Sequence, residues 1–233
     1  MNKKELFYES IARDFEKVMN SYEVNKRINL VFKKILNKNL NNKLFLDAGC
    51  GIGLFSAIAE KRGAKVTSLD VGKSLMKQVA KKSQSKRVVG LVTKLPFNDH
   101  SFDIVLATEV LEHTADPAKG FEELARVAKP GGKVIITVPN RLWWFSVPVA
   151  NLLKIRPYQG LENWLWWSDM KRLAKKNDLI IEKISGFNII PIFHPRLYRF
   201  IDIMDRFGNV AGPFMVNIAF VARKKKTRDR GEV

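Results

Sequence analysis

The stretch LFLDAGCGIG places Gly49, Gly51 and Gly53 directly after an apolar run that ends in an acid, Asp47. Glycine weakens the interior of a strand or helix, so this concentration indicates either a tight turn or the close approach of a ligand to the backbone. The helix predicted to follow adds free N–H groups and the positive end of its dipole. Because one glycine would suffice for a turn, the pattern favours a ligand site.

The glycine spacing excludes two familiar nucleotide-binding loops. A dinucleotide loop of the form G-x-G-x-x-G would need glycine at position 54, which is Leu54, and no Gly-Lys-Ser/Thr follows as in a phosphate-binding loop. What remains is G-x-G-x-G, with Asp70 at the end of the next predicted strand. A carboxylate placed there can hydrogen-bond the two hydroxyls of a ribose, although it could also cap the following helix.

His113 is a candidate general base, because it follows a predicted strand in ATEVLEHTADP, beside the glycine turn. Its imidazole could take the proton of a bound hydroxyl, or could hold the loop through a hydrogen bond. Glu109, Glu112 and His113 have i, i+3, i+4 spacing, so on a helical turn they could share a face and hold a divalent ion. We assign no metal site on this pattern. His194 is a second candidate base.

The elements that must position these residues are strands alternating with helices. The clearest helix begins with Asp116 as its N-cap and Pro117 in its first turn, and Gly131 and Gly132 lie beyond its end. Such alternation implies right-handed crossovers and an α/β fold with a doubly wound, mostly parallel sheet. The predicted strands span residues 44–49, 65–70, 88–92, 101–108, 133–139, 179–185 and 215–222.

The pattern divides the chain into four parts. Residues 1–40 are predicted to form an N-terminal helical cap, and residues 41–140 the core of the sheet. Residues 141–223 hold two aromatic insertions, expected to form a lid, and the last two strands; residues 224–233 form a basic, disordered tail. The apolar faces of the two cap helices comprise Phe7, Ile11 and Phe15 and, further along, Ile28, Val31, Phe32 and Ile35.

Four motifs stand in the order and spacing of a known family: LDAGCGIG, the acid of SLD, LPFNDHSFDIVLATEVLEH and KPGGKVIITVPN. Together they resemble the class I S-adenosylmethionine-dependent methyltransferases, most of all the branch of ubiquinone- and menaquinone-type methyltransferases. The resemblance covers residues 40–140. It implies a seven-stranded Rossmann-like sheet whose last strand, MVNIAFVA, runs antiparallel, and S-adenosylmethionine as the cofactor.

The resemblance also assigns residues to parts of this cofactor. Asp47, Gly49 and Gly51 would contact its amino-acid portion. Asp70 would hold the ribose hydroxyls, and Val71 would pack on the adenine. The expected cofactor-binding set further comprises Cys50, Gly53, Val92, Thr108 and Glu109. Members of the family often carry an acid near Val92 that reads the adenine amino group, but this chain has LVTK there. Cys50 is interpreted as a small residue in a crowded turn and not as a nucleophile.

The charge and the composition indicate which partners and which cellular compartment suit this chain. The 233 residues include 41 Lys and Arg against 23 Asp and Glu, a formal net charge of +18, which favours an anionic partner. Lysines crowd the second predicted helix and the tail, as electrostatic contact with anionic lipid would require. The single cysteine suits a reducing compartment, and no stretch has the length of a membrane span. We expect a cytoplasmic protein, peripheral on the inner face of the membrane.

The methyl acceptor is predicted from the aromatic segments. All five tryptophans lie within residues 143–167, and a second aromatic segment spans 187–214. Such clustering is typical of an apolar acceptor pocket or a membrane-interface belt, although it could also form the core of a lid. We predict a lipophilic or lipid-linked small molecule, methylated at oxygen. The alternative is an RNA or tRNA methyltransferase, which would place arginines among stacking aromatics. No pattern indicates an oligomeric state.

Overall fold

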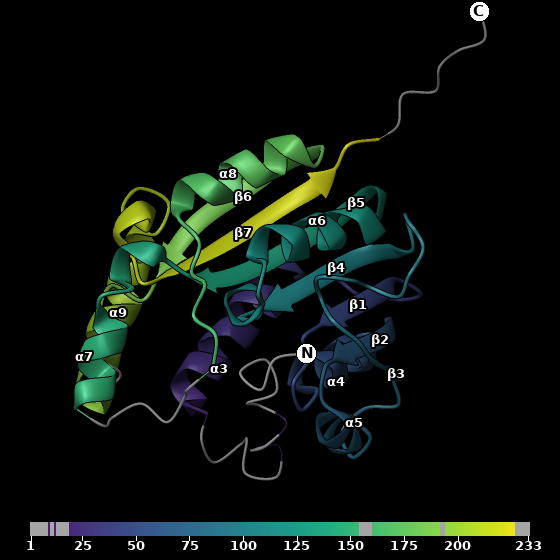
Figure 1. The fold of residues 1–233 in the computed structure, drawn as a ribbon, viewed down its shortest axis with the longest axis horizontal. Helices are drawn as coiled ribbons and strands as arrows, with labels where there is room; N and C mark the ends of the chain where they lie inside the picture. Colours follow the sequence, from purple (N-terminus) through teal and green to yellow (C-terminus); the bar gives the residue numbers. More distant parts are fainter. Residues whose placement is uncertain (1–8, 10–11, 13–18, 154–159, 192–193, 227–233) are drawn as a thin grey trace, which may run out of the picture.

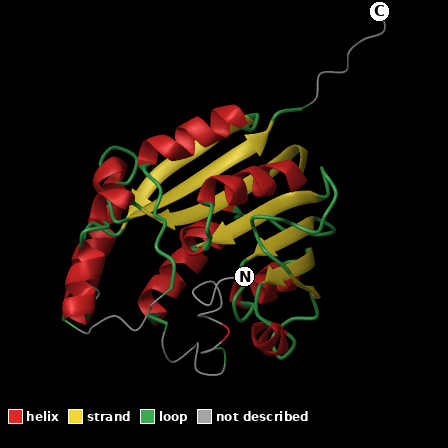
Figure 2. Cartoon of the chain, viewed as in Figure 1, coloured by secondary structure: helices red, strands yellow, loops and turns green. Residues whose placement is uncertain are grey.

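The computed structural model describes residues 9, 12, 19–153, 160–191 and 194–226, and these build a seven-stranded sheet with helices on both faces (Figures 1 and 2). The strand order is β3-β2-β1-β4-β5-β7-β6. The strands are β1 (Leu44–Ala48), β2 (Lys65–Asp70), β3 (Lys86–Val89), β4 (Phe102–Thr108), β5 (Ala128–Pro139), β6 (Leu179–Phe187) and β7 (Asn217–Lys224).

Strand directions follow the prediction. β1 to β5 pair in parallel, and β7 lies antiparallel between β5 and β6. The mostly parallel, seven-stranded sheet with an antiparallel last strand is therefore confirmed. The strand order reverses between β1 and β4, and in such sheets ligands bind beyond the carboxyl ends of the strands at this point.

Alternate side chains of each strand build one core on each face of the sheet. In β4, Val105 packs in the cluster that contains Phe121, whereas Ile104 packs in the cluster that contains Phe55. Figure 1 shows α6 and α8 in front of the sheet. The principal flanking helices are α3 (Ser21–Asn29), α4 (Leu54–Lys61), α5 (Lys73–Val79), α6 (Pro117–Val127) and α8 (Trp167–Lys176).

The local signals around α6 are partly confirmed. Asp116 is the N-cap and accepts a hydrogen bond from the backbone N–H of Lys119 at 2.9 Å, and Pro117 occupies the first turn. The glycines do not end this helix, however, because β5 begins directly after it. Gly131, with φ 78°, and Gly132 lie inside β5, where its register with β4 shifts.

The third strand is shorter than predicted. The sequence indicates a strand over 88–92, but β3 ends at Val89, and the N–H of Gly90 donates to the carbonyl of Asp70. Leu91 then makes only an isolated bridge with Lys94. The chain from Gly90 onward thus leaves the sheet and becomes free to line the neighbouring cavity.

The described residues include only part of each end of the chain. Of the first cap helix, Phe7, Ile11 and Phe15 lie outside the described residues. The second is α3, which continues as a π-helical stretch, η1 (Leu30–Ile35), whose Val31 and Phe32 are buried in the core. β7 extends through Lys224, so the predicted tail begins inside the sheet, and its residues 227–233 lie outside the described part.

The aromatic insertions fold into short helices beyond one end of the sheet (Figure 1). The first contains α7 (Ser146–Leu152) and the second α9 (Tyr198–Met204). Trp164 is buried and Trp167 packs against the main core, whereas Trp144 and Trp166 are exposed. The tryptophans therefore serve partly as packing and partly as surface. No helix in the described ranges is long and apolar enough to cross a membrane.

Candidate active site

The turn between β1 and α4 depends on glycine. Gly49, Gly51 and Gly53 have φ angles of 72°, 53° and 80°, a region that other residues rarely adopt. A Cβ atom on Gly49 would collide with the side chain of Val110, and one on Gly53 would press on Val79. Gly49 and Gly51 line a cavity, whereas Gly53 serves the packing of the turn.

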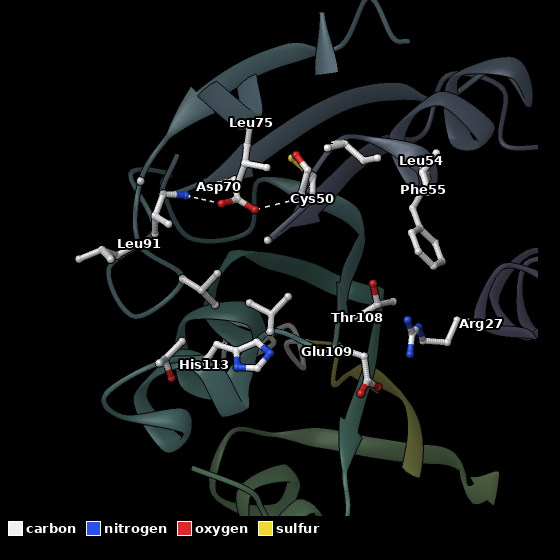
Figure 3. Close-up of a pocket in the computed structure, with 18 of the residues that line it drawn as sticks. Arg27, Cys50, Leu54, Phe55, Asp70, Leu75, Leu91, Thr108, Glu109 and His113 are labelled. Carbon is white, nitrogen blue, oxygen red and sulfur yellow. Dashed lines mark hydrogen bonds between the residues drawn. The ribbon is translucent and has the colours of Figure 1, made fainter. Parts of the chain in front are cut away.

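Asp70, at the end of β2, holds this turn in place (Figure 3). Its Oδ2 accepts a hydrogen bond from the N–H of Gly51 at 2.9 Å, and its Oδ1 accepts from the N–H of Val71 at 2.7 Å. Burial raises the pKa of the carboxyl to about 6, and the hydrogen bonds oppose this rise. One carboxylate therefore ties the loops after β1 and β2 together. The N-cap residue of α5 is Gly72 and not Asp70.

Asp47 does not line the cavity, unlike the expectation for a cofactor contact. It is almost fully buried, and its Oδ2 accepts a hydrogen bond from Ser56 Oγ at 2.6 Å. Ser56, Ser68 and Ser85 continue this contact as a buried hydroxyl chain. Burial raises the pKa of Asp47 to about 7. Its side chain thus fastens α4 to the sheet behind the glycine turn.

The other predicted site residues line one cavity at the carboxyl ends of the central strands. They are Gly49, Cys50, Gly51, Asp70, Val71, Val92, Thr108, Glu109 and His113. In Figure 3, Asp70 and His113 lie on opposite sides of it. Burial raises the pKa of the Cys50 thiol, as expected of a packed residue and not of a nucleophile.

Sequence reasoning missed Arg27 of α3, which also lines the cavity, because only the folded chain brings this helix near. The cavity lies beyond the carboxyl ends of the strands at the point where the strand order reverses, which is where such sheets bind their ligands.

The comparisons with known proteins agree with this geometry. Residues 46–136 match a family described as a methyltransferase domain. Over 167 residues the chain is 34% identical to the ubiquinone biosynthesis O-methyltransferase of Alkalilimnicola ehrlichii, an alignment that covers 66% of this chain and 67% of that protein. The chain is a class I S-adenosylmethionine-dependent methyltransferase.

Solved structures share the fold of this methyltransferase. One chain of the Haloferax volcanii complex between the Trm112 methyltransferase activator and a methyltransferase matches with a TM-score of 0.66 at 18% identity, over 94% of this chain and 98% of its own. An S-adenosylmethionine-dependent methyltransferase from Mesorhizobium loti matches with a TM-score of 0.62 at 15% identity, over 80% and 93%. S-adenosylmethionine is the cofactor.

The imidazole of His113 is oriented by the methyltransferase's own backbone. His113 closes a short 3-10 turn, η2 (Leu111–His113), and its Nδ1 lies 3.0 Å from the carbonyl oxygen of Leu161. Because a carbonyl only accepts, Nδ1 carries the proton, and the lone pair of the neutral ring is on Nε2. Nε2 lies 3.8 Å from Glu112 Oε1. The other candidate, His194, is exposed and accepts a hydrogen bond from the N–H of Arg196.

Glu109, Glu112 and His113 do not lie on one helical turn, the arrangement that their spacing left possible. Glu109 has φ 53°, outside the helical region, and the 3-10 turn begins only at Leu111. In the described part of the methyltransferase no group of three or more His, Cys, Asp or Glu side chains is arranged to hold a metal ion. Burial and the nearby Glu109 raise the pKa of Glu112 well above its ordinary value.

A second cavity of the methyltransferase adjoins the first. Arg27, Glu109 and His113 line both, so these three side chains stand at the boundary. The walls of the second cavity combine apolar side chains with the carboxylates of Glu23, Glu109, Glu112 and Glu162; the apolar side chains include Phe145, Val147, Val149, Leu153, Trp164 and Val216. The first aromatic insertion therefore encloses a cavity next to the cofactor site.

Proposed function

We propose that this enzyme transfers the methyl group of S-adenosylmethionine to a hydroxyl oxygen of a lipophilic, quinol-type or lipid-linked acceptor. The observation that carries the proposal is the pair of adjoining cavities, one lined by the glycine turn and Asp70, the other by the aromatic and aliphatic side chains of the first insertion together with four glutamates. The relative from Alkalilimnicola ehrlichii, named as a ubiquinone biosynthesis O-methyltransferase, points to the same acceptor class. Among the described residues that line the aromatic cavity, Arg27 is the one arginine, and this favours a small-molecule acceptor over RNA.

The cofactor assignment follows the lining of the first cavity. Gly49, Cys50 and Gly51 offer backbone against which the amino-acid portion can lie. Asp70 retains lone pairs for the ribose hydroxyls beside the hydrogen bonds that it accepts from the backbone of Gly51 and Val71. The adenine packs between Val71 and Val92, and Thr108 and Glu109 close the side toward the acceptor. Asp47 and Gly53 support this arrangement from behind.

The protein must position the two reactants, exclude water and remove one proton. The cofactor supplies an electrophilic methyl group, and its transfer is an in-line displacement in which positioning and exclusion of water dominate. A hydroxyl acceptor must also lose its proton. We assign this step to Nε2 of His113, whose proton-bearing Nδ1 is held by the carbonyl of Leu161 at 3.0 Å.

Incubating the protein with methyl-labelled cofactor and a bacterial lipid extract is expected to place label in an organic-soluble product. The label should resist mild alkali as an ether, because the proposed acceptor atom is a hydroxyl oxygen of a small molecule. Total RNA offered in parallel is expected to gain none. Label in RNA, or only in amines of the extract, would replace this acceptor assignment.

We further propose that the insertions dock on an anionic membrane and admit the acceptor from it. The α7 and α9 segments expose many apolar side chains, with Leu152 at 82% and Val210 at 84% exposure. Phe145, Val149 and Leu153 are both exposed and part of the acceptor cavity, so a path from the surface to the site is apolar. The second segment adds the exposed cations Arg196, Arg199 and Arg206.

A Leu152→Ser, Phe207→Ser, Val210→Ser variant is expected to sediment with anionic vesicles at least about tenfold less tightly than wild type. Burial of one large apolar side chain is worth about 1.5 to 3 kcal/mol. Losing the membrane burial of even one of the three side chains therefore weakens vesicle binding about tenfold. Added salt should weaken both proteins further, because the Debye length is only ~8 Å at physiological ionic strength.

The matched control is Val89→Ser, Ile180→Ser, which removes exposed apolar groups from strands away from the insertions. This control should bind vesicles like wild type. The docking face would be rejected if the triple variant bound anionic vesicles as tightly as wild type. It would also be rejected if wild type did not bind these vesicles.

A further inference from the structure

We infer that Asn217 is a positioning residue for Glu109, whose carboxylate it holds at the boundary of the two cavities. The inference rests on the function proposed above for this boundary. Asn217 is the first residue of β7, and Glu109 follows β4, so the contact joins two strands that are not neighbours in the sheet. No sequence motif links the two residues, which are 108 positions apart.

A buried pair of amides fixes the direction of this contact. Asn217 Nδ2 donates to Glu109 Oε2 at 3.1 Å, and Asn188 Nδ2 donates to Asn217 Oδ1 at 3.1 Å. Asn188 and Asn217 are 0% and 4% exposed, so water cannot replace these bonds. Because Asn217 presents its NH₂ group to Glu109, its carbonyl oxygen faces Asn188, which must then present its own NH₂ group.

Asn188, the residue of this hydrogen-bonded series farthest from Glu109, is held through its own backbone. The N–H of Asn188 donates to Asp205 Oδ1 at 2.8 Å, and its carbonyl accepts from the N–H of Val216 at 2.8 Å. Asp205 Oδ2 in turn pairs with Lys26 Nζ of α3 at 2.9 Å. The backbone of Asn188 is thus held by Asp205 and by Val216, and these two bonds fix the amide that orients Asn217.

Glu109 itself is constrained from both ends. Its φ of 53° is costly for a residue with a side chain, and its N–H donates to the carbonyl of Thr137 at 2.9 Å. With Oε2 engaged by Asn217, Oε1 is buried and has no hydrogen-bond partner among the described residues. Since Glu109 lines both cavities, Oε1 is the atom left to accept a hydrogen bond from a bound ligand.

A double-mutant cycle between positions 109 and 217 tests the role. With a short-chain alkylcatechol as acceptor, Asn217→Ala is expected to lower kcat about 10- to 100-fold, the size of one lost hydrogen bond to a charged group, with a smaller change in KM. In a Glu109→Ala background the same change should cost nothing further, because alanine leaves no oxygen to accept from Asn217, which acts only through the side chain of Glu109. The same cycle is measured on the dissociation constant of S-adenosylhomocysteine, which needs no acceptor.

Asn140→Ala is the matched control. Asn140 is an equally buried amide beside the same strand ends, and its Nδ2 donates to the carbonyls of Pro213 and Met215. Its loss should lower the melting temperature without coupling to position 109. Multiplicative losses in the cycle, or Asn217→Ala with unchanged kcat and unchanged cofactor affinity, would overturn the positioning role. A wild type that leaves the alkylcatechol unmethylated would count against the proposed acceptor class only, because the cofactor-affinity cycle still reports on Asn217.

Discussion

His113→Ala is expected to lower kcat for a hydroxyl acceptor by about 100- to 10,000-fold, the usual contribution of a general base. The imidazole is already oriented in the folded chain, because Nδ1 donates to the carbonyl of Leu161 at 3.0 Å, and Nε2 is the ring atom that we propose takes the proton. His113 lines both cavities, as a base that acts between donor and acceptor must. Steady-state kinetics with labelled cofactor measures the loss.

His194→Ala provides the matched control. This histidine is exposed and lines neither cavity, so its removal should leave kcat within about twofold of wild type, as for a surface change. If His113→Ala keeps near-normal turnover while its melting temperature falls, the histidine only ties η2 to the carbonyl of Leu161. The base would then have to be sought elsewhere.

Asp70→Ala is expected to weaken binding of S-adenosylhomocysteine by about 10- to 150-fold, measured by calorimetry. Hydrogen bonds to a charged group contribute about 1.5 to 3 kcal/mol, and each 1.4 kcal/mol is a factor of ten. The substitution removes the proposed ribose contact and also releases the N–H groups of Gly51 and Val71. The backbone that should receive the cofactor would therefore lose its shape as well.

The same carboxylate predicts how cofactor binding depends on pH. Its pKa is raised to about 6, so the ionised form, which accepts the most hydrogen bonds, declines below that pH. Affinity should fall as the pH is lowered through 6, and Asp70→Asn should remove this dependence. Undiminished binding by Asp70→Ala, or a pH dependence that survives in Asp70→Asn, would contradict the assignment.

The same carboxyl makes the stability of the ligand-free protein depend on pH in the opposite direction to cofactor affinity. The folded-state pKa of Asp70 lies above the value near ~4 of an unfolded chain, so the folded state binds the proton more tightly. This contribution to the free energy of unfolding is fully present below pH ~4 and is lost as the pH rises through about 6. Asp47, with its pKa raised to about 7, acts in the same direction.

Much of the fold could be predicted from the sequence because its signals are local. The cap of α6 needs only Asp116, Pro117 and the backbone of Lys119, all within one turn. The strand runs are equally local, since alternating or continuous apolar residues report burial directly. The errors concern boundaries where tertiary contacts compete, as at Gly90, whose N–H bonds to β2 beyond the end of β3.

The site was predictable to the extent that it is built from strand ends. The glycine turn, Asp70, Glu109 and His113 all follow strands of a parallel sheet, whose carboxyl ends meet at one edge. The resemblance assigned Asp47 to the amino-acid portion of the cofactor, whereas in the structure its side chain turns inward to Ser56. The helical face that spacing allowed for Glu109, Glu112 and His113 is absent, because the positive φ of Glu109 breaks the periodicity that such an argument assumes.

The sequence by itself determined the order of strands and helices, the glycine turn and the acid at the end of β2, because each depends on neighbours within a few residues. Only the tertiary structure decided which side chains share a cavity. Arg27 reaches the site from α3, and Asn217 reaches Glu109 across 108 positions of chain. Such contacts depend on sheet order and crossover geometry, which bring distant segments together and leave no periodic trace in either segment.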